Sequence, residues 1–210
     1  MRIGLFGGSF DPIHCGHLRP VQQAREALEI EEVIYLPTAR PPHKRGHEFA
    51  PAHARYTMVE LALLAQEGLF ASPFEMRPDR LSYTVETVEH FCRQRPEAEW
   101  VLLIGGDSLA ELVSWREWQR IVAMVELGVL VRPGWESDAL VEQLPAELRD
   151  ALGAGRLRFV PNEPVPISST DLRRRLAAGE EISPDVLPPL VLDYVRKYEL
   201  YQQQRRRRPA

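Results

Sequence analysis

Short apolar runs alternate along this chain with longer amphipathic stretches, and this alternation restricts the possible folds more than any other feature. Runs such as 101–104 and 127–131 lack regular polar alternation, which is typical of strands covered on both faces. We expect strands at residues 2–6, 32–36, 69–72, 100–104, 126–131 and 157–160. We expect helices between them at residues 18–28, 52–66, 84–95, 108–112 and 138–152. Strands that alternate with helices predict an α/β fold with a doubly wound parallel sheet and right-handed crossovers.

The length of the chain allows one sizeable hydrophobic core. Its 210 residues fit a single domain over residues 1–201, with a small C-terminal helical part over about 167–201. Helices are expected in that part at residues 169–178 and 188–198. Residues 202–210 form an arginine-rich tail, whose like charges predict a solvated end without a fold. Attachment to RNA or to an anionic surface is the alternative role of this tail.

Charge and composition narrow the classes of partner. The formal net charge of −4 and the pI near 5.9 argue against a general nucleic-acid binder, whose surface is usually basic. No stretch reaches the apolar length of a membrane span, and the start of the chain lacks the pattern of a secretory signal. Cys15 and Cys92 are too few and too far apart for a disulfide framework. We therefore expect a cytoplasmic protein that binds neither nucleic acid nor membranes, with monomer and homo-oligomer both open.

The segment after the first expected strand carries the strongest functional signal. Residues 7–17 read Gly-Gly-Ser-Phe-Asp-Pro-Ile-His-Cys-Gly-His. Gly7 and Gly8 allow a sharp turn and a close approach of the backbone to a ligand. If a helix begins within this segment, His14 and His17 lie on one face and point at one charge. The unpaired N–H groups and the dipole at a helix start also favour an anion. The sequence therefore predicts a phosphate site at the carboxyl end of this strand.

A plainer interpretation of the two histidines stays open. They would then be ordinary residues at a helix start, with backbone carbonyl groups as their partners. A start near Gly16 would place Pro20 in the first helical turn, where the missing N–H group has no cost.

A second phosphate site is predicted where the helix over 169–178 begins. Residues 167–176 read Ile-Ser-Ser-Thr-Asp-Leu-Arg-Arg-Arg-Leu. In the plainer interpretation Ser168 or Ser169 only caps the helix, which contributes about 1 kcal/mol. A capped helix start still presents its next N–H groups to an anion, and Arg173 adds a phosphate contact one turn later.

A third turn follows the strand expected at 100–104. Gly105 permits a close approach of the backbone, and Asp107 offers a carboxylate to ribose hydroxyl groups, as acidic residues do in dinucleotide-binding folds. The alternative role of Asp107 is to cap the helix that follows.

Seven motifs together resemble one enzyme family. In chain order they are the segment 7–17, Pro-Pro-His-Lys at 41–44, Ser-Tyr-Thr at 82–84, Gly-x-Asp-Ser at 105–108, Trp115, Arg-Pro-Gly at 132–134 and Ile-Ser-Ser-Thr at 167–170. With them the chain resembles the bacterial nicotinate-mononucleotide adenylyltransferases over about residues 1–201. The resemblance implies a Rossmann-like nucleotidyltransferase fold and a role in NAD biosynthesis, in which ATP and nicotinate mononucleotide give deamido-NAD and pyrophosphate. It also implies Mg²⁺ on the ATP phosphates, without dedicated protein ligands. Ser9 stands where threonine is frequent in the family, which preserves a hydroxyl group.

The same resemblance implies roles for individual residues. The catalytic residues would be His14, His17 and Arg173. The residues that bind ATP would be Gly7, Gly8, Ser9, Phe10, His14, His17, Gly105, Asp107, Ile167, Ser168, Ser169, Thr170 and Arg173. The residues that bind nicotinate mononucleotide would be Ser9, Lys44, Tyr83, Thr84, Trp115 and Arg132. Trp115 would stack on the pyridine ring, while the helix start at Thr84 would meet the ring carboxylate. Burial in the core is the alternative for Trp115, and it is the role expected of Trp118.

Other functions share parts of this pattern. Sister transferases that act on phosphopantetheine, glycerol phosphate or nicotinamide mononucleotide share the first motif. A metal-binding protein would use His14, His17, His43 and His47, whose spacings suit metal ligands, although no carboxylate or cysteine completes an obvious set. A nucleotide sensor would bind ATP without releasing pyrophosphate. A class I aminoacyl-tRNA synthetase is not expected, because the chain is short and has no Lys-Met-Ser-Lys-Ser segment.

Overall fold

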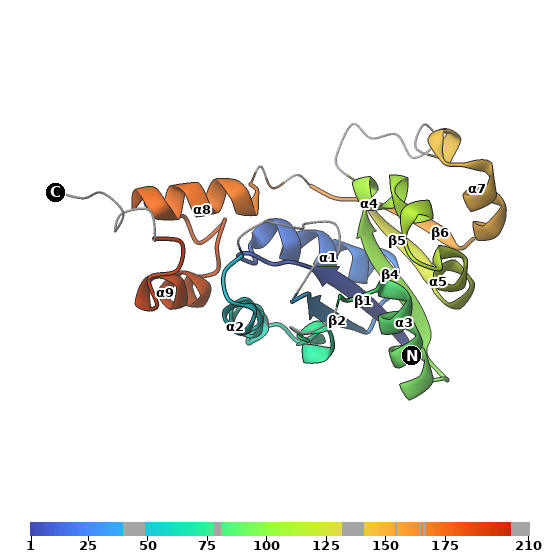
Figure 1. Cartoon of the computed structure of the whole chain (residues 1–210), viewed down its shortest axis with the longest axis horizontal. Helices are drawn as coiled ribbons and strands as arrows, with labels where there is room; N and C mark the ends of the chain where they lie inside the picture. The colour runs from blue at the N-terminus through green and yellow to red at the C-terminus, as the bar shows by residue number, and fades with distance from the viewer. Residues whose placement is uncertain are drawn as a thin grey trace.

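A parallel β-sheet forms the centre of the molecule (Figure 1). The computed structural model describes residues 1–39, 49–77, 81–131, 141–153, 155–163, 165 and 167–202. Within these residues six strands pair in parallel in the order β3-β2-β1-β4-β5-β6. The strands are β1 (Arg2–Gly8), β2 (Glu32–Pro37), β3 (Leu69–Ala71), β4 (Glu99–Gly105), β5 (Glu126–Val131) and β6 (Leu157–Pro161). The predicted α/β class and all six expected strands are confirmed.

Helices connect the strands and continue past the sheet toward the C-terminus (Figure 1). They are α1 (Cys15–Ala27), α2 (Ala52–Leu63), α3 (Thr84–Gln94), α4 (Gly106–Ala110), α5 (Trp118–Met124), α7 (Ala146–Leu152), α8 (Ser169–Ala178) and α9 (Pro189–Lys197), with the 3₁₀ turns η1 (Pro73–Glu75) and η2 (Leu112–Ser114). The C-terminal helices α8 and α9 match the two that were predicted there. In the described part of the chain, no helix combines the length and the apolar character needed to cross a membrane.

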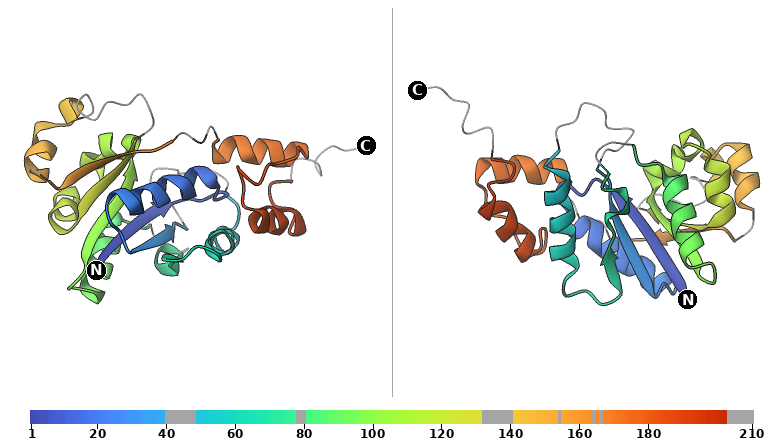
Figure 2. Two further views of the ribbon diagram at one scale, coloured as in Figure 1. Left: turned by 180° about the vertical axis from the view of Figure 1, so that it is seen from behind. Right: turned by 60° about the horizontal axis from the view of Figure 1, so that its bottom comes forward.

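Successive residues of the central strands face opposite sides of the sheet, where two separate cores form. In β2, Val33 and Tyr35 belong to one core, whereas Ile34 and Leu36 belong to the other. The first core includes residues of α1, α2, α8 and α9, and the second includes residues of α3, α4, α5 and α7 (Figure 2). Because helices cover both faces, the strands are apolar at successive positions, which explains the continuous apolar runs in the sequence.

The order in which the chain adds strands to the sheet reverses direction at β1. In this type of sheet, such a reversal marks the expected position of a ligand crevice. The chain runs outward from β1 through β2 to β3, and it later returns to β4 on the other side of β1. In doubly wound sheets ligands bind beyond the carboxyl ends of the strands at such a reversal. β1 ends at Gly8 and β4 ends at Gly105, so the first and third turns singled out in the sequence both lie at this point.

Two helical regions differ from the sequence prediction. The helix expected over 138–152 is not continuous: residues 141–143 are helical, Pro145 is the N-cap of α7, and 138–140 lie outside the described residues. Proline restricts the residue before it to extended conformations, so the helix breaks at this position. The seven residues of α5 were not predicted at all, because so short a helix shows little periodicity.

Gly128 in β5 allows close packing at the C-terminal end of α1, and its replacement is expected to destabilise the fold. A Cβ at this position would lie 2.7 Å from Cδ2 of Leu103 and 2.9 Å from Cδ1 of Leu28. Gly128→Ala should therefore lower the free energy of unfolding by about 1–3 kcal/mol, as overpacking does in other cores. Urea unfolding followed by circular dichroism measures this loss.

The exposed Leu64 provides the control for this measurement. Leu64→Ala should change the free energy of unfolding by less than about 0.5 kcal/mol. Equal losses in the two variants, or no loss at position 128, would contradict the packing described here.

Candidate active site

Two cavities adjoin the carboxyl end of β1. The first cavity has a volume of about 590 Å³ and reaches Gly7, Gly8 and Ser9. The second cavity has a volume of about 610 Å³ and reaches His14 and His17 at the start of α1. The loop over residues 9–14, which joins β1 to α1, therefore contributes to both cavities at the reversal of the sheet.

Phe10 fixes the shape of this loop from inside the protein. Its φ of 43° is left-handed, which is uncommon for a residue with a Cβ. The ring is buried and meets the His17 ring edge-on, with 5.2 Å between the ring centroids. A Cβ on Gly8 would come within 2.8 Å of the Phe10 ring, so this packing requires glycine at position 8. Phe10 supports the loop and lines neither cavity.

His14 and His17 hold the first turn of α1 through reciprocal hydrogen bonds. The N–H group of Gly16 donates to Nδ1 of His14 at 3.1 Å, and the N–H group of His14 donates to Nδ1 of His17 at 3.2 Å. Both histidines therefore act at the helix start, as the plainer interpretation expected, and the partners seen for their Nδ1 atoms are backbone N–H groups. Because both Nδ1 atoms accept, we assign the proton of each neutral ring to Nε2, which is then a donor.

The capping bonds also decide where α1 begins. His14 is the N-cap, the helix starts at Cys15, and Pro20 consequently lies in the second turn rather than in the first. Burial lowers the pKa of His14 to about 4, which favours the neutral ring. A proton on Nδ1 of His14 would remove the acceptor for the Gly16 N–H group, so only the neutral ring can cap the helix.

The N-terminus of α8 forms another wall of the second cavity. Ser168 accepts a hydrogen bond from the Asp171 N–H group at 3.1 Å, which confirms the predicted cap. Ser169 donates to the Pro12 carbonyl oxygen at 3.1 Å and so ties α8 to the loop before α1. Ile167, Ser168 and Ser169 all line the cavity. The N-termini of α1 and α8 therefore meet at one cavity, where both helix dipoles and the first N–H groups of α8 favour an anion.

Polar residues that the sequence analysis did not select also line the second cavity. They are Asn162, Glu163 and Asp171. Asn162 is buried, and its Oδ1 has no hydrogen-bond partner within the described residues. A buried acceptor without a partner is costly, so a ligand N–H group at this place would be stabilised. A single asparagine after a strand is too common in sequences to have marked this site.

Arg173 and Thr170 line neither cavity. Nη1 of Arg173 donates to the Asp11 carbonyl oxygen at 2.7 Å, and Nη2 donates to Oγ1 of Thr170 at 3.2 Å. The same guanidinium lies 3.5 Å from Oδ2 of Asp11. The structure thus brings Arg173 to the loop over residues 9–14, beside the second cavity rather than into its wall.

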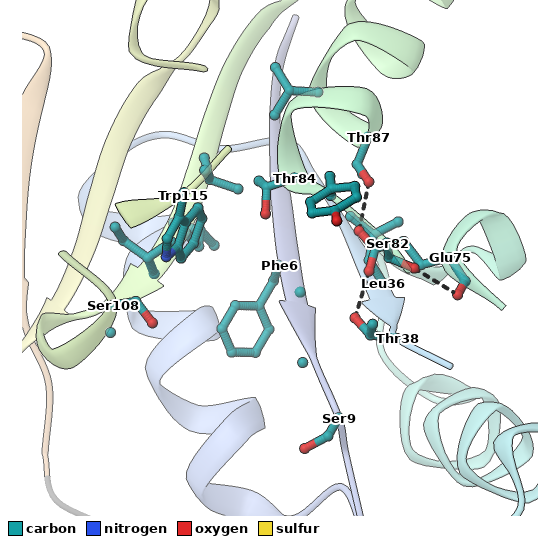
Figure 3. A pocket seen from close by; sticks show the side chains of 18 of the residues that line it. Phe6, Ser9, Leu36, Thr38, Glu75, Ser82, Thr84, Thr87, Ser108 and Trp115 are labelled. Atoms are coloured by element: carbon teal, nitrogen blue, oxygen red, sulfur yellow. Dashed lines mark hydrogen bonds between the residues drawn. The ribbon is translucent and has the colours of Figure 1, made fainter. Parts of the chain in front are cut away.

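The first cavity combines an indole ring with a helix N-terminus. Figure 3 shows Trp115 and Ser108 on one side of β1, and Thr87 and Thr38 on the other. Trp115 is half-buried against the second core, and Thr84 is the first residue of α3. The N-cap residue of α3, Tyr83, makes no capping hydrogen bond with its side chain. No side chain at the cap position therefore competes with a ligand carboxylate for the first N–H groups of α3.

Gly7 and Gly105 leave space at the ends of two neighbouring strands. A Cβ on either residue would meet no atom within 4 Å, and both residues line the first cavity. A side chain at either position would occupy part of the cavity, so glycine keeps this path to the backbone open, as the sequence suggested.

The turn after β4 excludes one alternative from the sequence analysis. Gly105 is the N-cap of α4, and Asp107 lies exposed in the first turn. The alternative role of Asp107 as the helix cap is therefore wrong. Asp107 lines neither cavity, whereas Gly105 and Ser108 line the first.

Trp118 is buried, as expected for a core residue.

Comparison with known proteins agrees with this geometry. A sequence model of the cytidylyltransferase-like family matches residues 5–175. The chain is 40% identical over 209 residues to a protein of Aeromonas salmonicida named "Probable nicotinate-nucleotide adenylyltransferase", and the match covers 95% of this chain and 97% of the relative. It is 38% identical over 200 residues to a protein of the same name from Symbiobacterium thermophilum, with 95% of each covered. The chain belongs to the nicotinate-nucleotide adenylyltransferase family.

A solved structure shares the fold. The Plasmodium falciparum nicotinic acid mononucleotide adenylyltransferase complexed with NaAD superposes with a TM-score of 0.71 at 19% identity, covering 95% of this chain and 97% of that one. Membership of the nicotinate-nucleotide adenylyltransferase family, which the motifs predicted, is confirmed by the relatives and the family match.

Glu75 is a buried acid of the first cavity that the sequence analysis missed. Oγ1 of Thr38 donates to Oε2 of Glu75 at 2.5 Å, and Oγ1 of Thr87 donates to Oε1 at 2.7 Å (Figure 3). Burial raises the pKa of Glu75, and the two hydroxyl hydrogen bonds oppose this effect. Oγ of Ser82 donates to the Glu75 carbonyl oxygen at 3.2 Å. Glu75 therefore links the end of β2 to α3 and sets the position of the cavity wall between them.

Arg116 brings a positive charge to the first cavity, and the sequence analysis missed it too. Its Cζ lies 4.8 Å from the centre of the Tyr83 ring, which is a cation–π contact. It also pairs with Glu86 at 3.8 Å and with Glu117 at 3.3 Å. The only sequence feature that could have indicated this role of Arg116 is its position directly after Trp115 in a polar stretch.

Arg55 holds the flanks of residues 40–48 beside the site. It is buried, and its Nε donates to the Ala50 carbonyl oxygen at 3.1 Å. Its Nη2 donates to the Ala39 carbonyl oxygen at 3.1 Å, and its Nη1 to that of Ser9 at 2.6 Å. One guanidinium thus joins the residues on both sides of 40–48 to the loop that follows β1.

Several predicted residues lie outside the described part of the chain. They are Lys44 and Arg132 of the expected mononucleotide site, and His43 and His47 of the metal-binding alternative. Within the described ranges, no group of three or more histidine, cysteine, aspartate or glutamate residues is placed to hold a metal ion.

The lowered pKa of His14 predicts a specific dependence of stability on pH. Below pH 6.5 the unfolded chain protonates His14, whereas the folded protein does so only near pH 4. The contribution of His14 to the free energy of unfolding is therefore fully present above pH 6.5 and decreases as the pH falls. The loss reaches about 3 kcal/mol at pH 4, because one pKa unit corresponds to about 1.4 kcal/mol.

His14→Asn tests this dependence, because asparagine keeps a capping oxygen but does not titrate. Urea unfolding from pH 7 to pH 4.5 should show a shallower loss of stability in the variant than in the wild type. Equal slopes in the two proteins would contradict a buried, neutral His14.

Proposed function

We propose that this protein joins ATP and nicotinate mononucleotide to give deamido-NAD and pyrophosphate, a step in NAD biosynthesis. The observation that carries the proposal is the pair of cavities that share the loop over residues 9–14 at the reversal of the sheet. Two helix N-termini at the second cavity suit a polyphosphate. An indole ring and a helix N-terminus at the first cavity suit an aromatic carboxylate. The names of the relatives support the same pair of substrates.

The triphosphate of ATP would lie in the second cavity. The Nε2–H groups of His14 and His17 would donate to phosphate oxygens, together with the first N–H groups of α8. The first N–H groups of α1 already have partners within the protein, so α1 would contribute only its dipole. Oδ1 of Asn162 would accept a hydrogen bond from an N–H group of the nucleotide, and Arg173 would reach the phosphates from beside the cavity. From the sequence we also assign to ATP ten further residues. Gly7, Gly8, Ser9 and Gly105 line the first cavity, Ile167, Ser168 and Ser169 line the second, and Phe10, Asp107 and Thr170 line neither.

Nicotinate mononucleotide would lie in the first cavity. Its pyridine ring would stack on Trp115, and its carboxylate would accept hydrogen bonds from the N–H groups at the start of α3, beside Thr84. Arg116 adds a positive charge on the same side of the cavity. Ser9, Tyr83, Lys44 and Arg132 complete the set that we assign to this substrate.

The proposed reaction needs no nucleophile from the protein. A 5′-phosphate oxygen of the mononucleotide attacks the α-phosphorus of ATP, and a new P–O bond forms. The bond from that phosphorus to the oxygen shared with the β-phosphate breaks, and pyrophosphate leaves with the electron pair. Catalysis then depends on alignment and on stabilisation of the charge on the phosphoryl oxygens. The ring donors of His14 and His17 and the two helix N-termini supply that stabilisation.

Mg²⁺ would enter with the ATP phosphates. Glu163 and Asp171 give the second cavity carboxylate oxygens, which are the donors that Mg²⁺ prefers, so the chemistry of the cavity fits the ion. We assign it no dedicated protein ligand, because the phosphate oxygens would hold it. When bound, the ion neutralises part of the phosphate charge.

We further propose that residues 1–201 act as one nucleotidyltransferase domain. The packing of α9 on α2 and the hydrogen bond from Tyr201 to Asp11 support the inclusion of the C-terminal helices. A cytoplasmic location and the lack of nucleic-acid and membrane partners stay predictions from the composition.

An assay with a panel of acceptors tests the proposed function. The purified protein is given Mg²⁺ and ATP with nicotinate mononucleotide, nicotinamide mononucleotide or phosphopantetheine, or CTP with glycerol phosphate. We expect pyrophosphate release to be at least about tenfold more efficient with nicotinate mononucleotide than with any other acceptor. The loss of a charge pairing costs about that factor or more. Preference for another acceptor would identify a sister transferase instead, and ATP binding without release would identify a sensor. Either result would contradict the proposal.

His17→Ala should lower kcat by at least about 100-fold, because it removes a preorganised donor to the transition state. Steady-state pyrophosphate release measures the effect, and circular dichroism checks the fold. His53→Ala is the control, since His53 lies exposed on α2, and its kcat should stay within about twofold of the wild type. A folded His17→Ala protein with near wild-type kcat would exclude this role.

Trp115→Ala should raise KM for nicotinate mononucleotide several-fold more than KM for ATP, because the indole ring stacks only on the pyridine. Trp115→Phe keeps an aromatic face and should recover most of the affinity. Equal changes in both KM values would count against stacking.

A further inference from the structure

Asp11 is a buried carboxylate at which distant segments of the chain meet. It lies in the loop over residues 9–14 and is 1% exposed. Its Oδ1 accepts hydrogen bonds from the Ala50 N–H group at 3.1 Å and from the Tyr201 hydroxyl group at 2.8 Å. Its carbonyl oxygen accepts from Nη1 of Arg173 at 2.7 Å. The loop, the segment just before α2, helix α8 and the segment after α9 are thus joined at one residue.

Tyr201 reaches Asp11 through a tight turn after α9. Glu199 and Tyr201 both have left-handed backbone conformations, with φ of 51° and 67°. Such conformations are unfavourable for residues with a Cβ, so they persist where other contacts compensate. The Leu200 N–H group donates to the Val195 carbonyl oxygen at 3.0 Å and closes the turn. Burial, followed by the charge of Asp11, raises the pKa of Tyr201, so its hydroxyl group keeps its proton and donates.

The two carboxylate oxygens of Asp11 have different surroundings. Oδ1 has two donors, whereas Oδ2 is buried, has no hydrogen-bond partner within the described residues, and lies 3.5 Å from Nη1 of Arg173. Burial lowers the pKa of Arg55, and the negative charge of Asp11 opposes this effect, so a second guanidinium lies within electrostatic range of the carboxylate. The rotation of the carboxylate therefore determines how much of its negative charge faces Arg173.

We propose that Tyr201 is a positioning residue for Arg173. By holding Oδ1, the hydroxyl group fixes the rotation of the Asp11 carboxylate so that Oδ2 faces the guanidinium. Arg173 is then held beside the second cavity, one helical turn from the Ser168 cap of α8. The C-terminal end of the domain thus tunes ATP binding through Asp11, without contacting a substrate. This inference rests on the proposed function, in which Arg173 meets the ATP phosphates.

Tyr201→Phe removes only the hydroxyl group and is the first test. Titration calorimetry with ATP and Mg²⁺ should show a dissociation constant about five- to tenfold higher than in the wild type, the scale on which hydrogen bonds to charged groups act. KM for nicotinate mononucleotide should stay within about twofold. Tyr198→Phe is the matched control, because Tyr198 lies three residues earlier and is 57% exposed, and both constants should be unchanged. Equal ATP affinity in Tyr201→Phe, Tyr198→Phe and the wild type would overturn the proposal.

A double-mutant cycle separates positioning from a general structural role. If Tyr201 acts through Arg173, adding Tyr201→Phe to Arg173→Ala should change ATP affinity by less than about twofold. A second full loss in the Arg173→Ala background would overturn the proposal, because the hydroxyl group would then act by another route. Melting temperatures of all variants, measured alongside, identify any loss of affinity that follows from partial unfolding.

The ATP titration keeps this proposal separate from the proposed function. If the acceptor assay fails but Tyr201→Phe still weakens ATP binding in an Arg173-dependent way, the positioning role stands and the acceptor is wrong. If the acceptor assay succeeds and Tyr201→Phe binds ATP normally, the enzyme assignment stands and the positioning role is wrong.

Discussion

The hydrogen bonds from backbone N–H groups to the imidazole rings of His14 and His17 determine much of the site. Because they occupy Nδ1 of each ring, they start α1 and leave each neutral ring with an Nε2–H group, which is a donor. A histidine that would otherwise both donate and accept therefore offers a ligand only a donor, which suits the oxygens of a polyphosphate. A neutral donor also binds an anion less tightly than a full cation does, and in the proposed reaction this moderate affinity would help pyrophosphate to leave.

The helix N-termini at the two cavities differ in how they are capped. His14 caps α1 and Ser168 caps α8, whereas the side chain of Tyr83 makes no capping bond to α3. The second cavity thus has helix ends whose geometry the protein itself fixes before a ligand arrives. At the first cavity a ligand carboxylate would complete the start of α3. An amide in its place would lack the negative charge that a helix N-terminus favours, so this difference provides a physical basis for choosing the acid over the amide.

The fold was predictable from sequence because burial on both faces leaves a local signal in each strand. Local chemistry also identified the Ser168 cap, which depends on residues three apart. The interactions of Glu75 and Asp11 were not predictable, since they form only after distant segments pack together. Tyr201 is 190 positions from Asp11, and no pattern near either residue indicates the contact. The hydrogen bond from Arg173 to the Asp11 carbonyl oxygen was not predictable for the same reason, because every residue carries such a carbonyl group.

The buried Arg55 has a consequence for how this edge of the protein can evolve. Its guanidinium holds the carbonyl groups of Ala39 and Ala50, so the entry and exit of the intervening stretch are anchored to the body of the protein by one side chain. Substitutions between these anchors would leave the end of β2 and the start of α2 where they are. Apart from Lys44, which we assign to substrate binding, the composition of this stretch could therefore change without refolding the scaffold, whereas a change at Arg55 would release both ends at once.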